Sequence, residues 1–171
     1  MIELSSKRLR IISLSLVEFQ LFVTDIQAME KKLGLVAEGV NLEGEVKIAM
    51  EELLEMAQKD LSNLQWLTSW QIILITENRV IGSACFMGPP NEKGEVEIGY
   101  GINEPYRGHG YMTEAVIVLS NWALIQKDVN AVTAKTGKDN PSSWRVLEKA
   151  GLIKSGEDDE GHYTWTKWLN S

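Results

Sequence analysis

The sequence predicts one mixed α/β domain over residues 1–171, and three observations lead to that fold class. The length of 171 residues suits a single domain, because domains average roughly 100–200 residues. The spacing of apolar residues changes several times between the three-to-four spacing of helices and the alternation of strands. The resulting order is strand, two helices, three strands, helix, strand, helix and two strands, and no repeat, linker or low-complexity tract interrupts it.

The N-terminal half begins with a short apolar strand over 9–12 and continues with two helical patterns, over 19–33 and 46–61. Glycines and an asparagine at 34, 39, 41 and 44 predict a loop between these helices. Two β-branched, apolar runs follow, over 70–76 and 80–87, and the Glu77-Asn78 pair between them is typical of a hairpin turn.

The next strand carries the clearest alternation in the chain. We expect it to bury one set of side chains and to present Glu97, Gly99 and Gly101 on its other face, unless a bulge breaks the pattern. The set expected to be buried is Val96, Ile98, Tyr100 and Ile102.

The C-terminal part predicts a long helix over about 111–126, with an apolar stripe from Tyr111 to Ile125. A strand over 131–136 and a helix over 141–150, closed by Gly151, come next. The final strands are expected over 152–155 and 162–169, around an acidic turn.

Composition excludes several classes of protein. The chain has 17 basic and 24 acidic side chains, for a net charge of −7, and both halves are acidic, which argues against nucleic-acid binding. The single cysteine, Cys85, permits no internal disulfide and no multi-cysteine zinc site, so we expect no metal. We also expect a cytoplasmic protein without membrane contact, because no apolar run has the length of a signal peptide or a membrane span.

The segment Pro105-Tyr-Arg-Gly-His-Gly-Tyr-Met-Thr-Glu-Ala115 carries the chemistry. Gly108 and Gly110 precede a helix, so successive backbone N–H groups could face one bound anion at its positive end. Arg107 adds a charge and His109 a donor, which together favour a diphosphate site. The alternative is a glycine-rich turn that only starts a helix. The spacing is neither that of a Walker loop nor the full Rossmann fingerprint.

These residues resemble a known family. Arg107-Gly-His-Gly110 is similar to the Arg/Gln-x-x-Gly-x-Gly/Ala signature of the GNAT superfamily of N-acetyltransferases. The segment from Asn140 to Leu152 is similar to the Asn-x-x-Ser-x-Arg-Val-Leu-Glu-Lys-x-Gly-Phe segment of its Rim-type branch, the ribosomal-protein-alanine acetyltransferase-like proteins. Glu97-Ile-Gly-Tyr100 and the opening residues 6–11 also resemble that branch. The resemblance implies a GNAT-like fold, in which a mixed, mostly antiparallel and twisted sheet is flanked by helices.

The resemblance further implies acetyl-CoA as co-substrate. We expect Met112, where the signature usually has Gly or Ala, to tighten the diphosphate pocket while offering its backbone N–H. Leu147 stands where many members have a tyrosine that acts as general acid, so that role is not carried over. The residues expected to bind the cofactor are Gly101, Ile102, Asn103, Arg107, Gly108, His109, Gly110, Tyr111, Met112 and Asn140.

Acetyl transfer needs a neutral amine, and deprotonating a lysine-like amine at pH 7 costs roughly 4–5 kcal/mol. Glu97, which the strand pattern puts beside Gly99 and Gly101, is therefore our candidate for the general base. The resemblance implies Ser143 as the group that protonates the leaving thiolate. The alternatives are a solvated strand carboxylate for Glu97 and an ordinary first-turn residue for Ser143. Asn140 fits a helix N-cap as well as a contact to the pantetheine arm.

The expected activity is acetyl transfer from acetyl-CoA to a primary amine, by direct attack in a ternary complex. The acceptor is a small molecule or a protein N-terminus, and a homodimer is a guess from the fold. Two other classes stay open: a non-catalytic acyl-CoA-binding or sensing module, and a structural subunit that binds nothing. The acidic run 157–160 is either a solubilising turn or a feature that attracts a cationic acceptor.

Overall fold

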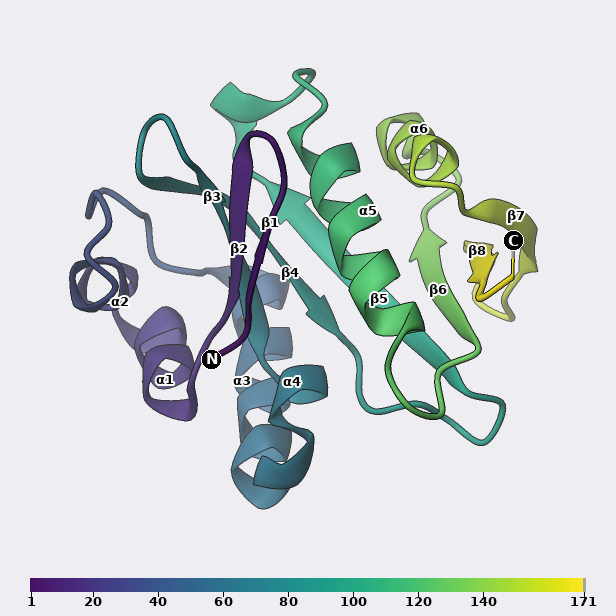
Figure 1. Ribbon diagram of the computed structural model, residues 1–171, viewed down its shortest axis with the longest axis horizontal. Helices are drawn as coiled ribbons and strands as arrows, with labels where there is room; N and C mark the ends of the chain where they lie inside the picture. Colours follow the sequence, from purple (N-terminus) through teal and green to yellow (C-terminus); the bar gives the residue numbers. More distant parts are fainter. Residues whose placement is uncertain (171) are drawn as a thin grey trace.

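The centre of the protein is a twisted sheet of eight strands, seen in a computed structural model that describes residues 1–170 (Figure 1). The strand order is β1-β2-β3-β4-β5-β6-β8-β7, and every neighbouring pair is antiparallel except β5 and β6. Ser171, the last residue of the predicted domain, lies outside the described residues. The strands are β1 Glu3–Ser5, β2 Leu9–Ser13, β3 Ser69–Leu74, β4 Arg79–Phe86, β5 Glu95–Ile102, β6 Ala131–Thr136, β7 Ile153–Glu157 and β8 Tyr163–Trp168.

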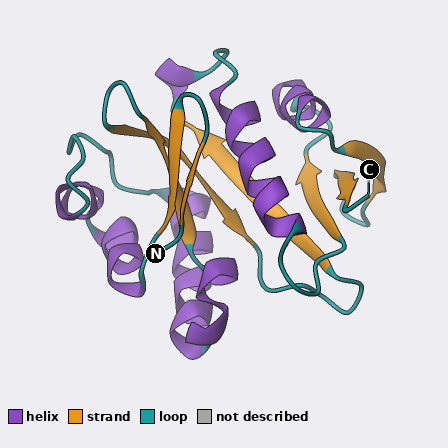
Figure 2. Ribbon diagram, in the orientation of Figure 1, coloured by secondary structure: helices purple, strands orange, loops and turns teal. Residues whose placement is uncertain are grey.

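Helices cover both faces of this sheet (Figure 2). Their apolar sides contribute to two separate core clusters. Helices α5 and α6 pack with the sheet in one cluster, and α1 to α3 pack in the other. The predicted α/β fold, a mixed and mostly antiparallel sheet flanked by helices, is therefore confirmed. Within residues 1–170, no helix has the length and apolarity needed to cross a membrane. The helices are α1 Leu16–Thr24, α2 Ile26–Lys32, α3 Gly44–Lys59, α4 Leu64–Leu67, α5 Tyr111–Leu124 and α6 Pro141–Lys149, with short 3₁₀ turns at Leu61–Asn63 and Glu104–Tyr106.

The larger core cluster lies under α5. Trp66, Trp70, Phe86 and Trp122 meet there, with ring centroids from 4.8 to 6.5 Å apart. Large aromatic rings bury much apolar surface and prefer such tilted contacts. This cluster holds the C-terminal part of α5 against β3 and β4 through Trp122.

The alternation predicted for β5 is confirmed. Val96 and Ile98 are 1% and 2% exposed, and Tyr100 and Ile102 are half-buried against the same cluster. No bulge interrupts the pairing of β5 with β4, so Glu97 and the two glycines share the opposite face.

Several features differ from the sequence prediction, including the short helix α4, which was not predicted. The helix predicted over 19–33 is broken at Asp25, whose φ of −154° is not helical and whose carboxylate caps α2 by accepting from Ala28 N–H. Strand β1 was not predicted; it pairs with β2 at the sheet edge. Helix α5 ends at Leu124, and Ile125 is 79% exposed instead of buried in the apolar stripe.

Two glycines on the adjacent strands β4 and β5, Gly82 and Gly101, should respond differently to alanine. A Cβ at Gly82 would lie 2.5 Å from the Gly101 carbonyl oxygen, whereas a Cβ at Gly101 would meet nothing within 4 Å. We expect Gly82→Ala to lower the free energy of unfolding by about 1–3 kcal/mol, as overpacking does. Gly101→Ala, the matched control, should leave it unchanged or raise it by up to about 1 kcal/mol. Urea denaturation measures both, and equal losses would contradict the prediction.

Candidate functional site

The site begins where β5 and β6 separate. The two strands pair over only three positions, and the last pair joins Glu97 to Thr133. Beyond it, β5 continues to Ile102 and β6 to Thr136 without pairing to each other. The unpaired backbone edges of this opening can accept hydrogen bonds from, and donate them to, an extended ligand.

The glycine loop closes the end of this opening. Gly108 and Gly110 both have φ of +78°, in the left-handed region that other residues adopt only at a cost. Gly110 is also the N-cap residue of α5, and its lack of a side chain leaves the first turn of the helix without a side-chain cap. The N–H groups of that turn have no intrahelical acceptor, so they are available to an anion.

Two predicted loop residues face solvent. The side chain of Arg107 is exposed and forms no hydrogen bond or ion pair with residues 1–170, so its charge is free for a ligand. The ring of His109 stacks on Tyr111, with centroids 5.6 Å apart, and its Nδ1 lies 3.3 Å from the Tyr106 carbonyl oxygen. The loop therefore combines backbone donors, one free cation and one imidazole.

Met112 does not narrow this loop, contrary to expectation. Its side chain is 4% exposed and belongs to the core cluster under α5. Only its backbone faces the loop, because a first-turn residue of a helix can turn its side chain inward while its N–H points along the axis.

The sequence did not reveal the contacts of Arg8 and Glu114 that hold the glycine loop in place, which we call the brace. The Arg8 guanidinium donates from Nε to a Glu114 carboxylate oxygen at 2.7 Å and from Nη1 to the His109 carbonyl at 3.0 Å, and it lies over the Tyr111 ring. Burial alone would raise the pKa of Glu114, but hydrogen bonds from Ser6 and Arg8 lower it overall. The one signal in the sequence was the acidic Glu114 in the first turn of α5. Its partners, Ser6 and Arg8, lie more than 100 positions away, so no local pattern connects them to it.

The start of α6 borders the opening from the other side. Asn140 is the N-cap: its side-chain oxygen accepts from Ser143 N–H at 3.2 Å and from the Ser142 hydroxyl at 2.9 Å. Tyr100 crosses from β5 and donates its hydroxyl to the Ser143 carbonyl at 3.4 Å. Burial raises the pKa of Tyr100 to about 12, so the phenol remains a donor at neutral pH. The Ser143 hydroxyl has no partner within residues 1–170.

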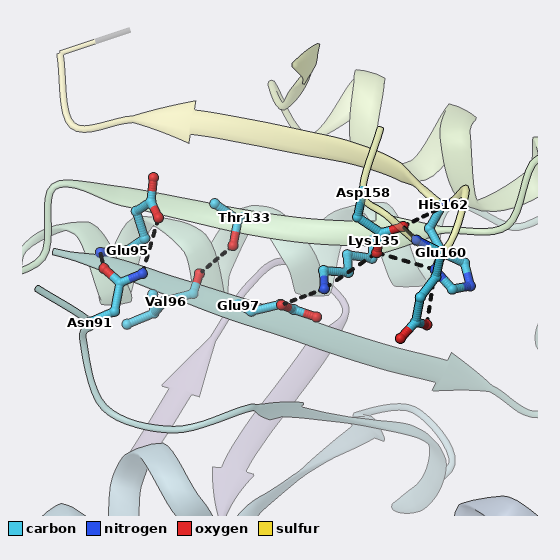
Figure 3. Close-up of polar contacts among 9 residues, drawn as sticks. All are labelled: Asn91, Glu95, Val96, Glu97, Thr133, Lys135, Asp158, Glu160 and His162. Atoms are coloured by element: carbon cyan, nitrogen blue, oxygen red, sulfur yellow. Dashed lines mark hydrogen bonds and ion pairs between the residues drawn. The ribbon is translucent and has the colours of Figure 1, made fainter. Parts of the chain in front are cut away.

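Glu97 lies on the opposite face of β5 from Tyr100 and is one-third exposed. The Lys135 ammonium lies between two carboxylates, 4.0 Å from Glu97 and 3.4 Å from Asp158 (Figure 3). Asp158 accepts from the backbone of His162 and contacts its ring at 3.2 Å. These bonds, the backbone one first, lower the pKa of Asp158 to about 2, so it is charged at neutral pH.

Most carboxylates of the acidic turn 157–160 have a basic partner, which the sequence did not indicate. Glu157 is paired with Lys138 at 2.7 Å, Asp158 with Lys135, and Glu160 lies 3.7 Å from the His162 ring. Three of the four carboxylates therefore have a basic neighbour, which reduces the field that the turn projects into solvent.

Two remaining side chains are core residues. Leu147 is fully buried, and its alkyl side chain has no proton to donate. Cys85 is 7% exposed and pairs with Gly99 across the sheet. Burial first, and the charge of Glu97 second, raise the pKa of the Cys85 thiol to about 11, which makes it a poor nucleophile at neutral pH.

Together these features fit a diphosphate-bearing ligand with an extended arm. The helix terminus and Arg107 suit the diphosphate, and the separated strands suit the arm. Among residues 1–170, no group of three or more His, Cys, Asp and Glu side chains is arranged to hold a metal ion. The fold and the glycine loop are typical of one class of protein: α/β domains that bind such a ligand where two neighbouring strands of the sheet separate.

Comparison with known proteins narrows this class. Residues 37–153 match the family model described as "Acetyltransferase (GNAT) domain", and the chain belongs to that family. The "Uncharacterized N-acetyltransferase YjdG" of Bacillus subtilis is 38% identical over 92 residues, which cover 54% of this chain and 55% of that protein. The "Uncharacterized N-acetyltransferase p20" of Bacillus licheniformis is 30% identical over 60% of each chain. The matches thus span little more than half the length of these relatives.

Solved structures share the fold over nearly the whole chain. The ribosomal-protein-S5-alanine acetyltransferase from Vibrio fischeri superposes with a TM-score of 0.70 at 15% identity, covering 100% of this chain and 98% of that one. A spermidine N-acetyltransferase from Vibrio cholerae, described as dodecameric, has a TM-score of 0.66 at 11% identity, with 96% of each chain covered.

The buried thiol gives a direct test of the site's chemistry. With its pKa raised from 9.0 to about 11, Cys85 should carry about 100-fold less thiolate at pH 8 than an ordinary cysteine, and burial slows it further. We expect labelling by a disulfide reagent to be at least 100-fold slower in the folded protein than in guanidinium chloride. Rapid stoichiometric labelling of the folded chain would show that the thiol is accessible and reactive.

Proposed function

We propose that this protein is an acetyl-CoA-dependent N-acetyltransferase that acts on a primary amine by direct attack within a ternary complex. The observation that carries the proposal is the left-handed glycine loop at the uncapped N-terminus of α5, next to the opening between β5 and β6. Family membership supports the same donor. The poor nucleophilicity of Cys85 favours direct attack over an acyl-enzyme route.

The chain's own groups would hold the co-substrate in three places. The N–H groups from Gly108 to Met112 and the Arg107 guanidinium bind the diphosphate, and His109 adds a donor. The backbone of Gly101, Ile102 and Asn103 pairs with the pantetheine arm as a further strand would. One of these N–H groups stabilises the oxyanion of the tetrahedral intermediate.

Proton transfers are assigned to two side chains. Glu97 removes a proton from the acceptor ammonium, directly or through water, which makes the amine nucleophilic. The amine nitrogen then bonds to the acetyl carbon, and the carbon–sulfur bond breaks. The Ser143 hydroxyl gives its proton to the leaving thiolate and regains one, through water, from the nitrogen as the amide forms. Asn140 acts chiefly as the helix cap that orients Ser143, because its side-chain oxygen is already engaged.

The acceptor is proposed only as a class: a small-molecule amine or a protein N-terminus. The two solved neighbours are named for a ribosomal protein and for spermidine, and both of those substrates carry amines. The proposal also places the protein in the cytoplasm, and in a homodimer as the simplest assembly. The alternative, a non-catalytic acyl-CoA sensor, rests on the absence of a tyrosine at position 147.

Calorimetric titration with CoA tests the binding half of the proposal. We expect Arg107→Gln to weaken binding about ten-fold or more, because a charge-assisted phosphate contact is lost. Lys59→Gln removes an equal charge from the end of α3 and should change Kd less than about two-fold. If the wild-type protein gives no heat with CoA, both the enzyme and the sensor are excluded.

Turnover separates the enzyme from the sensor. An acetyl-CoA thiol-release screen over N-terminal peptides, polyamines, amino acids and aminoglycosides should reveal an acceptor. With that acceptor, Glu97→Gln should reduce kcat by about 10²-fold or more, and Ser143→Ala by about 10-fold or more, while Kd for CoA is retained. Unchanged kcat in both variants would remove these residues from the mechanism, and a failed screen with intact CoA binding would favour the sensor.

A further inference from the structure

A large cavity lies on the face of the sheet that carries Glu97 and the two glycines of β5. Its volume is about 540 Å³, within the range of small-molecule sites. The floor is formed by β3, β4 and the end of β5, and the walls come from α1, α2, α3 and the loop 38–42. Gly101 belongs both to this floor and to the strand edge proposed to hold the pantetheine arm, so the cavity opens onto the reaction site.

One row of paired residues crosses the floor. Gln71 of β3 pairs with Ser83 of β4, which pairs with Gly101 of β5, so all three point to the same face. A Cβ at Gly101 would meet nothing within 4 Å, which leaves open space above the row. The row therefore offers two polar side chains beside an unobstructed stretch of backbone.

The Gln71 side chain has an unmet acceptor. It is fully buried, and its Nε2 donates to the Ser69 hydroxyl at 2.9 Å, but its Oε1 has no hydrogen-bond partner. The Ser83 hydroxyl also has no partner within residues 1–170. A buried carbonyl oxygen without a donor is costly, and a ligand N–H group in the cavity would satisfy it.

The chemistry of the cavity walls indicates which class of ligand the cavity fits. Phe22, Ile26, Leu42 and Val46 make them largely apolar. A peptide in such walls would leave its own backbone groups unpaired, whereas an alkyl or aryl chain would not.

The charges favour a cation. Glu30 is 2% exposed, accepts one hydrogen bond from Gly39 N–H at 2.8 Å, and has no cationic partner within the described residues. The single basic side chain of the lining, Arg79, is already ion-paired with Glu38 and lies 3.7 Å from Glu77. A substrate carboxylate would therefore meet net negative charge, and an ammonium would be attracted.

We propose that this cavity is the acceptor site and that it takes a small primary amine with an apolar body and no carboxylate. The reacting amine lies toward β5, and Gln71 and Ser83 accept hydrogen bonds from a donor at the far end of the body, such as a hydroxyl or a second ammonium group. This inference rests on the proposed acetyltransferase function and narrows its acceptor from amines in general to this class. Gln71 and Ser83 are specificity-determining residues in this assignment, separate from the proton transfers given to Glu97 and Ser143.

Matched substrate pairs test the chemical class. With saturating acetyl-CoA, tyramine should be used with kcat/KM at least ten-fold above that of tyrosine, and cadaverine at least ten-fold above that of lysine. Each pair differs by one carboxylate. Equal use of amine and amino acid would overturn the inference, and so would a clear preference for an alanine-led hexapeptide.

Variants test the residues. Gln71→Met keeps the volume but removes the acceptor, so KM for tyramine should rise about ten-fold while KM for acetyl-CoA changes less than two-fold; Ser83→Ala should act in the same direction. Ser120→Ala is the control, because it also removes a buried hydroxyl without a partner, but from α5 and outside the cavity. Unchanged KM for tyramine in both cavity variants would overturn the assignment while the enzyme activity stands.

A binding measurement separates failure of the site from failure of the activity. Tyramine titrated into the protein saturated with CoA needs no turnover. Its heat should be present in the wild type, and its Kd should be about ten-fold higher in Gln71→Met. If no amine is acetylated, the proposed function fails, but this titration still decides the cavity: heat supports it, and its absence overturns it.

Discussion

The limited parallel contact between β5 and β6 is the constraint on which the rest of the structure depends. A parallel neighbour needs a crossover, and α5 supplies it, so the helix must begin where β5 ends. Three paired positions fix the two strands at one end, and their divergence leaves backbone donors and acceptors unused at the other. The glycine loop, the helix terminus and the cap of α6 all meet at that divergence.

Under the proposed function, an acidic protein would hold a polyanion here without surrounding it by cations. The geometry supports a solution based on backbone dipoles, with Arg107 as the one side chain left unpaired in the loop. The second nearby cation, Arg8, is neutralised by Glu114 and serves to orient the backbone. On the other face, the uncompensated Glu30 gives the opposite preference. The glycine loop and the cavity thus favour opposite charges.

Local patterns made much of this predictable. The alternation in β5, the glycines at 108 and 110 and the proline and glycine that bound α6 depend on neighbours in the sequence, and each was found where expected. The features that were missed depend on distant partners. The break at Asp25 and the inward side chain of Met112 follow from packing, and the unmet oxygen of Gln71 follows from a register that three strands set together. Sequence periodicity carries no record of such contacts.

The brace between Arg8 and Glu114 also has a consequence for how the chain assembles. It joins residues 106 positions apart, so the loop gains its final shape only after the first strands and α5 have been synthesised and docked. Chains that have paired β2, β3 and β4 but not formed this contact would have part of the sheet in place and a glycine loop without its final conformation. Competence to bind ligand would then be among the last properties acquired during folding, and ligand would in turn favour the completed state by mass action.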